Sequence, residues 1–295
     1  MRLSSPVHLL FVVASLVACR PASPADGRTI LVDDAGDSVH LGASSERVVS
    51  LSPATTELLF AIGAGDRLVG RTRWCDYPLE ALAVVDVGDA IPPNIEAVLA
   101  RHPDLVLLYR SPQNAAAAAR FRSAGIAAIQ LTNDRLSDVP RLARLLGPLV
   151  GRAASAESLA TAFERDLAAA TVSDTLAPGR HSLLILAWDQ PPIAIGGGSF
   201  QSELVTRAGG RNVFADLPVP SGTVSIEAIT SRNPDFLLMN DSVLPGIDRR
   251  PEWQVVPAVR AHRYLFLRNS AFGRPGPRAP QLVRELRALI AGAPR

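Results

Sequence analysis

The chain lacks the residue patterns on which most enzymes and metal sites depend. Its five His residues are scattered, and no HExxH, GxSxG or P-loop motif occurs. Gly63-Ala64-Gly65 stands at the end of a predicted helix, whereas a dinucleotide site needs its glycines at a strand-to-helix turn. These absences argue against an enzyme and against a His-rich zinc or manganese receptor. We therefore expect no catalytic residue, no metal and no resident cofactor.

An excess of one charge is also missing. The chain has 30 basic residues, all of them Arg because no Lys occurs, and 28 acidic residues, which gives a net charge of +2. No basic stripe with interleaved aromatic residues is present, and such a stripe is typical of nucleic-acid-binding surfaces. We therefore expect no nucleic-acid partner.

Long hydrophobic runs are restricted to the start of the chain. Arg2 precedes the mostly apolar run Val7–Val17, which is short for a membrane span, and Leu16-Val17-Ala18-Cys19 ends it. Leu-x-Ala-Cys resembles a bacterial lipobox, in which the Cys becomes the lipidated first residue of the mature protein. The alternative is ordinary cleavage with Cys19 incidental. We predict a lipoprotein signal peptide over residues 1–19 and a protein anchored to a membrane in the periplasm or at the cell surface.

Cysteine is scarce, and this limits disulfides. The chain has two Cys residues, and lipidation of Cys19 would leave Cys75 without a partner. After the signal, Arg20–Gly27 is rich in Pro, Ala and Ser and predicts a flexible tether. Thr29–Leu41 alternates around a turn, which predicts a β-hairpin. We therefore assign residues 20–46 to a tether and hairpin.

What the sequence does contain is an internal repeat. Ile95–Leu108 reads IEAVLARHPDLVLL and Ile226–Met239 reads IEAITSRNPDFLLM, with seven of fourteen positions identical. Each copy follows a capping residue, Asn94 or Ser225, and predicts a short helix, a Pro-Asp break and a buried strand. The copies lie too far apart for a solenoid, so the repeat predicts two similar α/β lobes.

A long helix is predicted between the two copies. Ala153–Val172 places Leu159, Phe163 and Leu167 on one face, four residues apart, with Ser155 as its cap. Twenty helical residues would span roughly 30 Å, about the width of a small domain. This length suits a strut between two lobes.

Strands and helices alternate on both sides of this helix, which predicts mostly parallel sheets. We assign residues 47–151 to an N-terminal lobe, 152–174 to the linking helix and 175–295 to a C-terminal lobe. Ligands bind such sheets at the carboxyl ends of the strands, so the loops there are candidates for a site. Gly196–Gly198 lies in one such loop; we favour a strand exit there over an anion-binding nest.

Aromatic residues make up only 5% of the chain, yet Trp74 and Trp188 both follow predicted strands. Such rings on two facing lobes would sandwich a large flat ligand. The alternative is that each ring covers the core of its own lobe. Both interpretations stay open for Trp74 and Trp188, whereas core packing is favoured for Trp253.

Glu96 and Glu227 hold equivalent places in the two copies, each in the first turn of a helix. A carboxylate there stabilises a helix by about 0.3–1 kcal/mol, which explains either residue alone. As a pair, with one on each lobe, they also suit contacts with Arg on a two-fold symmetric partner.

Four stretches together resemble the iron/cobalamin type of periplasmic binding protein. These are Arg47–Leu59, Val69–Pro78, Asn94–Leu107 and Asn269–Arg278. The resemblance runs from Arg47 to the C-terminus. It implies two α/β lobes joined by one long helix, little hinge motion, a ligand held in the cleft, and a monomer. It also implies an ABC permease and its ATPase as partners, with Glu96 and Glu227 docking on the permease.

The resemblance also implies site residues. Trp74 falls where the family pattern has a ring-stacking Tyr, and Arg274 falls on an Arg in the C-terminal lobe with Phe272 beside it. Our first hypothesis is therefore a receptor for cobalamin or a related corrinoid. Trp74, Trp188 and Phe272 would pack on the ring, and Arg274 would bind its amide or phosphate edge.

Two other interpretations remain. In the second interpretation, the same scaffold binds a ferric siderophore or haem. Anionic oxygens of that ligand would then contact Arg71, Arg73, Arg274 and Arg278. Haem would need an axial Tyr or His, and Tyr77 is the loop candidate. The third interpretation is an enzyme or a cell-surface sensor on this scaffold.

Overall fold

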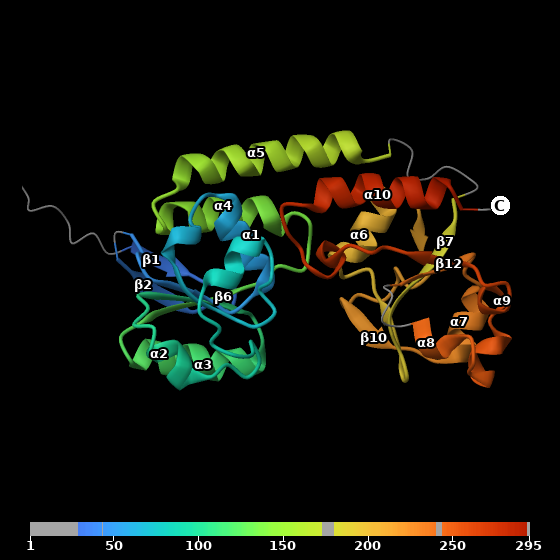
Figure 1. Ribbon diagram of the computed structural model, residues 1–295, viewed down its shortest axis with the longest axis horizontal. Helices are drawn as coiled ribbons and strands as arrows, with labels where there is room; N and C mark the ends of the chain where they lie inside the picture. Colours follow the sequence, from blue (N-terminus) through green and yellow to red (C-terminus); the bar gives the residue numbers. More distant parts are fainter. Residues whose placement is uncertain (1–28, 43, 173–179, 240–243, 294–295) are drawn as a thin grey trace, which may run out of the picture.

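The computed structural model describes residues 29–42, 44–172, 180–239 and 244–293, and two sheets lie toward opposite ends of it (Figure 1). The chain begins with the predicted hairpin, an antiparallel pair of β1 (Thr29–Val32) and β2 (Ser38–Leu41). The predicted signal peptide, Cys19 and the tether lie outside the described residues.

The sheet of the N-terminal lobe is wholly parallel within the described residues, in the order β4-β3-β5-β6. Its strands are β3 (Val48–Ser50), β4 (Leu68–Arg71), β5 (Leu105–Tyr109) and β6 (Ala127–Leu131). Its helices are α1 (Pro53–Ala61), α2 (Ile95–Leu99), α3 (Pro112–Ser123) and α4 (Asp138–Leu149), with short 3-10 turns at Gly65–Arg67 and Leu79–Ala83. The predicted alternation of strand and helix is confirmed in this lobe.

The sheet of the C-terminal lobe is mixed, in the order β10-β8-β7-β11-β12, with β9 beside the start of β7. Its strands are β7 (Ser182–Asp189), β8 (Pro192–Ile195), β9 (Arg211–Asn212), β10 (Ser221–Thr223), β11 (Phe236–Met239) and β12 (Tyr264–Phe266). Its helices are α6 (Phe200–Arg207), α7 (Ile226–Arg232), α8 (Leu244–Ile247), α9 (Pro257–Arg260) and α10 (Ala279–Ala291), with 3-10 turns at Pro251–Val255 and Ser270–Gly273. β9, β11 and β12 continue the parallel pattern, whereas β8 and β10 form an antiparallel edge.

The two copies of the repeat fold alike in detail. Asn94 and Ser225 each accept a hydrogen bond from the backbone N–H three residues on, at 3.1 Å, as predicted for caps. His102 and Asn233 occupy equivalent positions and share a left-handed backbone, with φ of 47° and 43°. The same sequence pattern therefore produces the same helix, the same turn and the same strand entry.

The Pro-Asp break also has one role in both lobes. The Asp104 carboxylate accepts the backbone N–H groups of Glu46 and Arg47, which lead into β3. The Asp235 carboxylate accepts both the backbone N–H (2.7 Å) and the hydroxyl of Ser182, the first residue of β7. Each aspartate thus fixes the start of the neighbouring strand.

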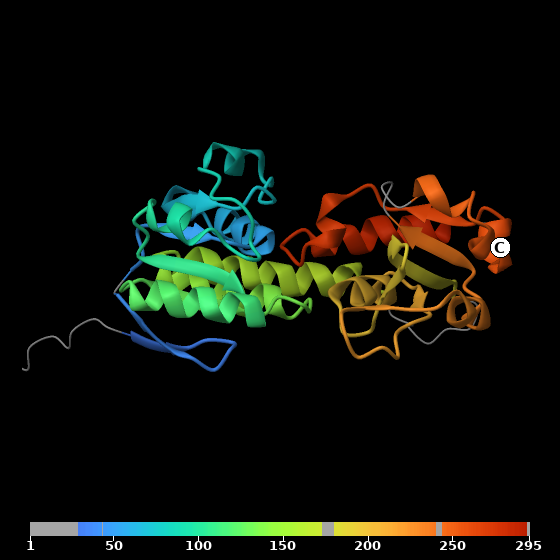
Figure 2. The same ribbon diagram turned by 90° about the horizontal axis from the view of Figure 1, so that it is seen from below.

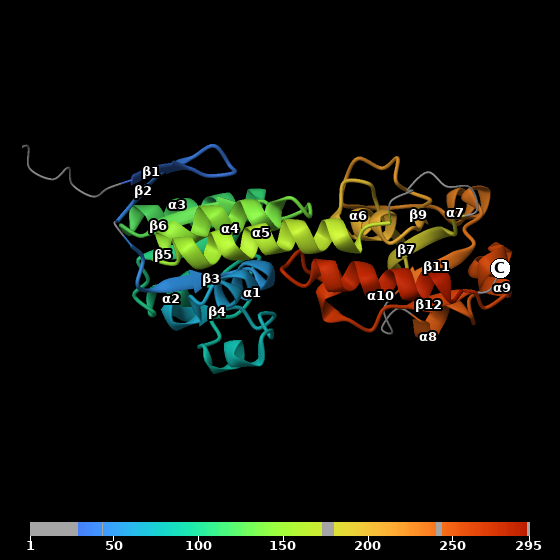
Figure 3. The same ribbon diagram turned by 90° about the horizontal axis from the view of Figure 1, so that it is seen from above.

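Helix α5 (Ala153–Ala170) is the predicted strut. Figure 2 shows it reaching from the first lobe to the second, and Figure 3 shows it beside α10. Phe163 and Leu167 are buried and Leu159 is partly buried, which confirms the predicted apolar face. One continuous apolar core runs through α4, α5 and α10 and into both sheets.

The predicted cap of this helix is wrong. Ser155 lies inside α5, whose N-cap is Arg152 with no side-chain cap bond. The start of α5 is set instead by its tight turn from α4: a Cβ on Gly147 would lie 2.3 Å from the Cβ of Ala156, so only glycine permits this approach. Glu157 lies beyond the first turn of α5 and pairs with Arg144 of α4 at 3.0 Å.

Two further predictions concern buried residues. Trp253 is 0% exposed within the core of the C-terminal lobe, so the interpretation as core packing is confirmed. Cys75 is buried and has no disulfide partner among the described residues, which do not include Cys19.

Candidate functional site

Two adjoining hollows lie at the carboxyl ends of the parallel strands of both lobes. The first, which we call the inter-lobe cavity, has a volume of about 310 Å³. Its N-terminal-lobe side includes Ser52, Ala90, Tyr109, Asn133 and Asp134, and its C-terminal-lobe side includes Gln201, Pro220, Gly273 and Arg274. Residues from both lobes therefore face one space.

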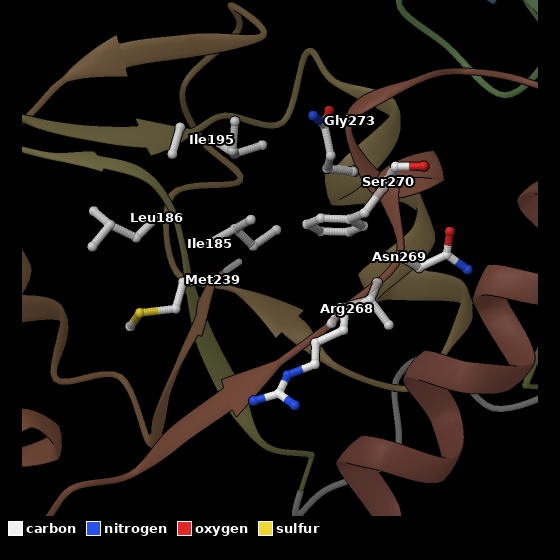
Figure 4. A pocket seen from close by; sticks show the side chains of 12 residues that line it. Ile185, Leu186, Ile195, Met239, Arg268, Asn269, Ser270 and Gly273 are labelled. Carbon is white, nitrogen blue, oxygen red and sulfur yellow. The ribbon is translucent and has the colours of Figure 1, made fainter. Parts of the chain in front are cut away.

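The second hollow, which we call the C-lobe recess, has a volume of about 480 Å³. Leu186, Met239 and Ile195 lie on one side of it, and Asn269 and Ser270 lie on the other (Figure 4). Leu267, Phe272 and Gln201 complete most of the wall. Gln201 and Gly273 line both hollows, so the recess adjoins the inter-lobe cavity.

The N-terminal-lobe side of the cavity holds a hydrogen-bonded pair. The Tyr109 hydroxyl donates to Oδ1 of Asp134 at 2.9 Å. Burial and the nearby Asp134 carboxylate raise the pKa of Tyr109 to about 12, because both disfavour a second negative charge there. Tyr109 is therefore a neutral phenol near pH 7 and offers ring surface to a ligand.

Arginines at the junction of the lobes are already paired with carboxylates. Arg278 binds both oxygens of Glu57 at 2.8 and 2.7 Å, and Glu57 is only 3% exposed. Arg274 binds both oxygens of Asp76, and its hydrogen bond holds the pKa of Asp76 below the ordinary value. Arg135 pairs with Glu203. Each of these three pairs joins one lobe to the other.

Two of the arginines proposed to bind an anionic cargo, Arg71 and Arg73, already have partners within the N-terminal lobe. Arg71 is buried, and its guanidinium donates to the carbonyls of Ala81 and Thr72. Arg73 pairs with Asp89 at 3.1 Å. The expectation that Arg71 meets the ligand is therefore wrong, because the side chain supports its own loop.

The five residues predicted to bind the ligand fall into two groups. Phe272 lines the C-lobe recess and Arg274 lines the inter-lobe cavity. Trp74, Tyr77 and Trp188 line neither hollow.

The three remaining aromatic rings lie on the surface or beneath another side chain. Trp74 and Trp188 are 59% and 51% exposed, so neither ring is buried in the core of its own lobe. Their indole N–H groups bind Asp89 and the Gln190 carbonyl. The Tyr77 ring lies under the Arg278 guanidinium at 3.6 Å, a cation–π contact.

Glu96 and Glu227 are both exposed, on α2 and α7. Both helices lie on the side of the molecule opposite α5, one on each lobe (Figure 1). Hydrogen bonds from its own backbone N–H and from Ser225 lower the pKa of Glu227. Both glutamates are therefore exposed on one side of the molecule, one on each lobe.

The glycine run forms a strand exit and not an anion nest. The N–H groups of Gly196 and Gly197 donate to the carbonyls of Pro220 and Leu217. A Cβ on Gly197 would lie 2.0 Å from the carbonyl oxygen of Ala215, which explains the need for glycine.

Sequence reasoning missed several residues of the two hollows. Asn133 and Asp134 follow β6 almost directly, so the rule that ligands meet strand ends would have found them. Gln201, the second residue of α6, carries no such signal, because its place at the site depends on how the lobes meet.

Comparison with known proteins agrees with this architecture. The family described as periplasmic binding protein matches residues 48–271. The chain belongs to that family. Its members are solute-binding proteins.

Individual relatives cover nearly the whole chain. An uncharacterized ABC transporter substrate-binding lipoprotein, YvrC of Bacillus subtilis, is 30% identical over 96% of this chain and 95% of its own. The vitamin B12-binding protein of Pectobacterium carotovorum is 29% identical over 85% of this chain and 92% of its own.

Solved structures share the fold. The periplasmic vitamin B12-binding protein BtuF of Vibrio cholerae matches 84% of this chain and 97% of its own, at 25% identity and a TM-score of 0.71. The periplasmic haem-binding protein RhuT of Roseiflexus sp. RS-1 matches 84% and 98%, at 25% identity and a TM-score of 0.72. These confirm the predicted fold of two α/β lobes joined by a long helix.

Membrane-spanning helices and metal sites were both sought among the described residues. No helix among them combines the length and apolarity that crossing a membrane requires. No group of three or more His, Cys, Asp or Glu side chains in this part of the chain is arranged to hold a metal ion.

Proposed function

We propose that this chain is the substrate-binding lipoprotein of an ABC importer and that its cargo is cobalamin or a related corrinoid. The observation that carries the proposal is the inter-lobe cavity with its adjoining C-lobe recess, beside which Arg135, Arg274 and Arg278 already have carboxylate partners. A corrinoid is large, rich in neutral amides and nearly uncharged, so it suits a site without unpaired positive charge. The relatives named vitamin B12-binding protein support the same cargo.

Haem is the second candidate, because the haem-binding protein RhuT shares the fold at the same identity as BtuF. An axial ligand for its iron is the difficulty. No His lines either hollow within the described residues, and the Tyr109 hydroxyl donates to Asp134 with a raised pKa. Tyr77 lines neither hollow and lies under Arg278. A corrinoid carries its own axial base and needs no such side chain.

A ferric siderophore of the anionic type is also less suitable. Its oxygens would need cations, and Arg274, Arg278 and Arg135 are each held by a carboxylate. Recruiting any of these three arginines to such a cargo would break a pair that joins the lobes.

Absorption titration distinguishes the three cargoes, since each has its own visible spectrum. We expect the full chain, purified in detergent, to retain cyanocobalamin on gel filtration and to release haem and a ferric siderophore. Trp74 and Trp188 would cover the ring at the edge of the cleft, so Trp74→Ala weakens retention. Retention of haem alone would contradict the proposal.

The exposed pair Glu96 and Glu227 would dock on the permease. Reversing both charges, Glu96→Arg with Glu227→Arg, should abolish cobalamin-dependent growth and co-purification with the permease while ligand binding is kept. Glu80 and Glu252 provide a matched control, since each is an exposed acid in the first turn of a 3-10 helix, one on each lobe. Equal losses in the two double variants would overturn the docking role.

The membrane anchor would be Cys19, in front of the lobes that we place at 47–151 and 175–295, with the linking helix at 152–174. Cys19→Ser should abolish metabolic labelling with palmitate and move the protein from the membrane to the soluble fraction. Label retained in that variant would refute the anchor without affecting the cargo.

A further inference from the structure

The inter-lobe cavity has two charged side chains in its wall, Asp134 from the N-terminal lobe and Arg274 from the C-terminal lobe. Arg274 is already bound to both oxygens of Asp76. Asp134 is half-buried and forms no ion pair with any residue that the structure describes. Within the described part of the chain, Asp134 is therefore the one charged side chain of the cavity wall that lacks an ion-pair partner.

A tyrosine orients this carboxylate. The Tyr109 hydroxyl donates its one proton to Oδ1 of Asp134 at 2.9 Å, so it has no proton left to donate to a ligand. No second hydrogen bond to Asp134 comes from the residues described. The Oδ2 atom of Asp134 is therefore an open acceptor in the wall of the cavity.

The arginines nearest to Asp134 in the chain and across the sheet are bound elsewhere. Arg135, the next residue, pairs with Glu203 of the C-terminal lobe. Arg110, at the end of the neighbouring strand, donates to Oγ1 of Thr132 at 3.1 Å. Because neither guanidinium is bonded to Asp134, a ligand that fills the cavity must itself satisfy this carboxylate.

Asn133 adds a second acceptor on the same side. It lines the cavity and is 8% exposed, with its Nδ2 at 3.5 Å from Oγ of Ser52. Its Oδ1 accepts no hydrogen bond from the described residues. Two consecutive residues just beyond β6 thus offer acceptor oxygens, one of them charged. This wall suits a ligand that presents N–H groups and repels one that presents a carboxylate.

We propose that Asp134 is a specificity-determining residue, which accepts a hydrogen bond from a primary amide of the cargo and rejects a carboxylate at the same position. The proposal rests on the proposed corrinoid cargo, whose ring carries several neutral amide side chains. One of these amides donates to Oδ2 of Asp134. Hydrolysis of that amide removes the donor and places two negative charges side by side, so the receptor selects the fully amidated corrinoid.

Monocarboxylic derivatives of cyanocobalamin, each with one amide hydrolysed, provide the test. Calorimetry of the full chain in detergent at pH 7.5, where such a carboxylate is ionised, gives the affinities. The wild type should bind at least one isomer roughly tenfold to hundredfold more weakly than cyanocobalamin, the worth of one charge-assisted hydrogen bond.

Asp134→Asn keeps the size of the side chain and removes its charge. This variant should bind cyanocobalamin less than about tenfold more weakly than the wild type, and it should bind the discriminated isomer within about threefold of cyanocobalamin. The other isomers, whose carboxylates lie away from Asp134, should keep their affinities relative to cyanocobalamin. Asp134→Ser, which also removes the charge, repeats the comparison with a smaller side chain.

Asp66→Asn is the matched control, because Asp66 is an exposed aspartate of the same lobe that lines neither hollow. It should leave every ratio of affinities unchanged. If the wild type binds cyanocobalamin and all isomers equally, or if removing the charge of Asp134 changes no ratio, the specificity role is refuted while the cargo stands. If the wild type binds no corrinoid, the proposed function fails and the role of Asp134 with it.

Discussion

The strand of the repeated segment Ile95–Leu108 belongs to the parallel sheet of the N-terminal lobe. The strand of its counterpart, Ile226–Met239, belongs to a sheet with an antiparallel edge. Caps, left-handed turns and the aspartates that fix the next strand are the same in both. The ends of the strands are different: one lobe presents the Tyr109–Asp134 pair and the other presents a recess. The repeat has thus kept a scaffold and not a binding surface.

If the proposed cargo is held between the lobes, this difference presents a different surface to each of its two faces. Backbone groups of the repeat bond within the capped helices and to the neighbouring strands, so the scaffold does not depend on the side chains beyond the strand ends. The residues beyond the strand ends, which face the cleft, can therefore differ between the two lobes. Contacts that join the lobes and contacts within each lobe should therefore respond differently to mutation.

The largest expected effect is at the pair that joins the lobes beneath the cleft. Arg278→Met should lower the free energy of unfolding by about 3–5 kcal/mol, because it leaves the buried Glu57 carboxylate without its partner. Arg274→Met is the control: its partner Asp76 is exposed, so the loss should be below about 1 kcal/mol. Chemical denaturation measures both, and similar losses would contradict the distinction.

The two aspartates of the repeat come next. Asp235→Ala should cost about 1–3 kcal/mol, because the N–H and hydroxyl of the buried Ser182 lose their acceptor. The equivalent Asp104→Ala should cost less, since the N–H groups of Glu46 and Arg47 are exposed and water replaces the carboxylate. Equal costs in denaturation experiments would show that the two lobes do not differ in this way.

Acid should affect the pair at the cleft surface. The pKa of Asp76 is lowered in the folded state, so the stabilisation is present above the ordinary aspartate pKa of about 3.9 and is lost as pH falls through the folded value. The difference in free energy of unfolding between the wild type and Asp76→Asn should thus be constant from about pH 5 to 8. This difference should vanish in strong acid. A difference that persists at the lowest pH would exclude this pair as its source.

The smallest expected effect concerns the left-handed residues. His102→Gly should stabilise the chain by at most about 1 kcal/mol, because glycine adopts a positive φ without strain. Asn233→Gly should change stability less, since Asn tolerates this conformation better than His. Thermal melting of the two variants would show the contrast, and a larger gain at Asn233 would contradict it.

Sequence predicted the scaffold well because its determinants are local. The repeat, its caps and the apolar face of α5 depend on residues within a few positions of one another. The Ser155 cap was wrong because the contact between Gly147 and Ala156, made across two helices, decides where α5 begins.

The candidate site was only partly predictable for the same reason. Phe272 and Arg274 could be assigned by resemblance, and both line the hollows. The pairing of Glu57 with Arg278 joins residues 221 positions apart, and Gln201 reaches the site only because the lobes meet beside it. No local pattern carries such information. The roles of all the predicted site residues stay predictions, namely Trp74, Tyr77, Trp188, Phe272, Arg274, Glu96, Glu227 and Cys19.

The most direct test of the central claim is a calorimetric titration of the full chain with cyanocobalamin. The account predicts saturable binding of one corrinoid per chain, because the two lobes form one shared site. It also predicts that prior saturation with haem does not prevent this binding. No detectable heat with cyanocobalamin, together with stoichiometric binding of haem, would contradict the account.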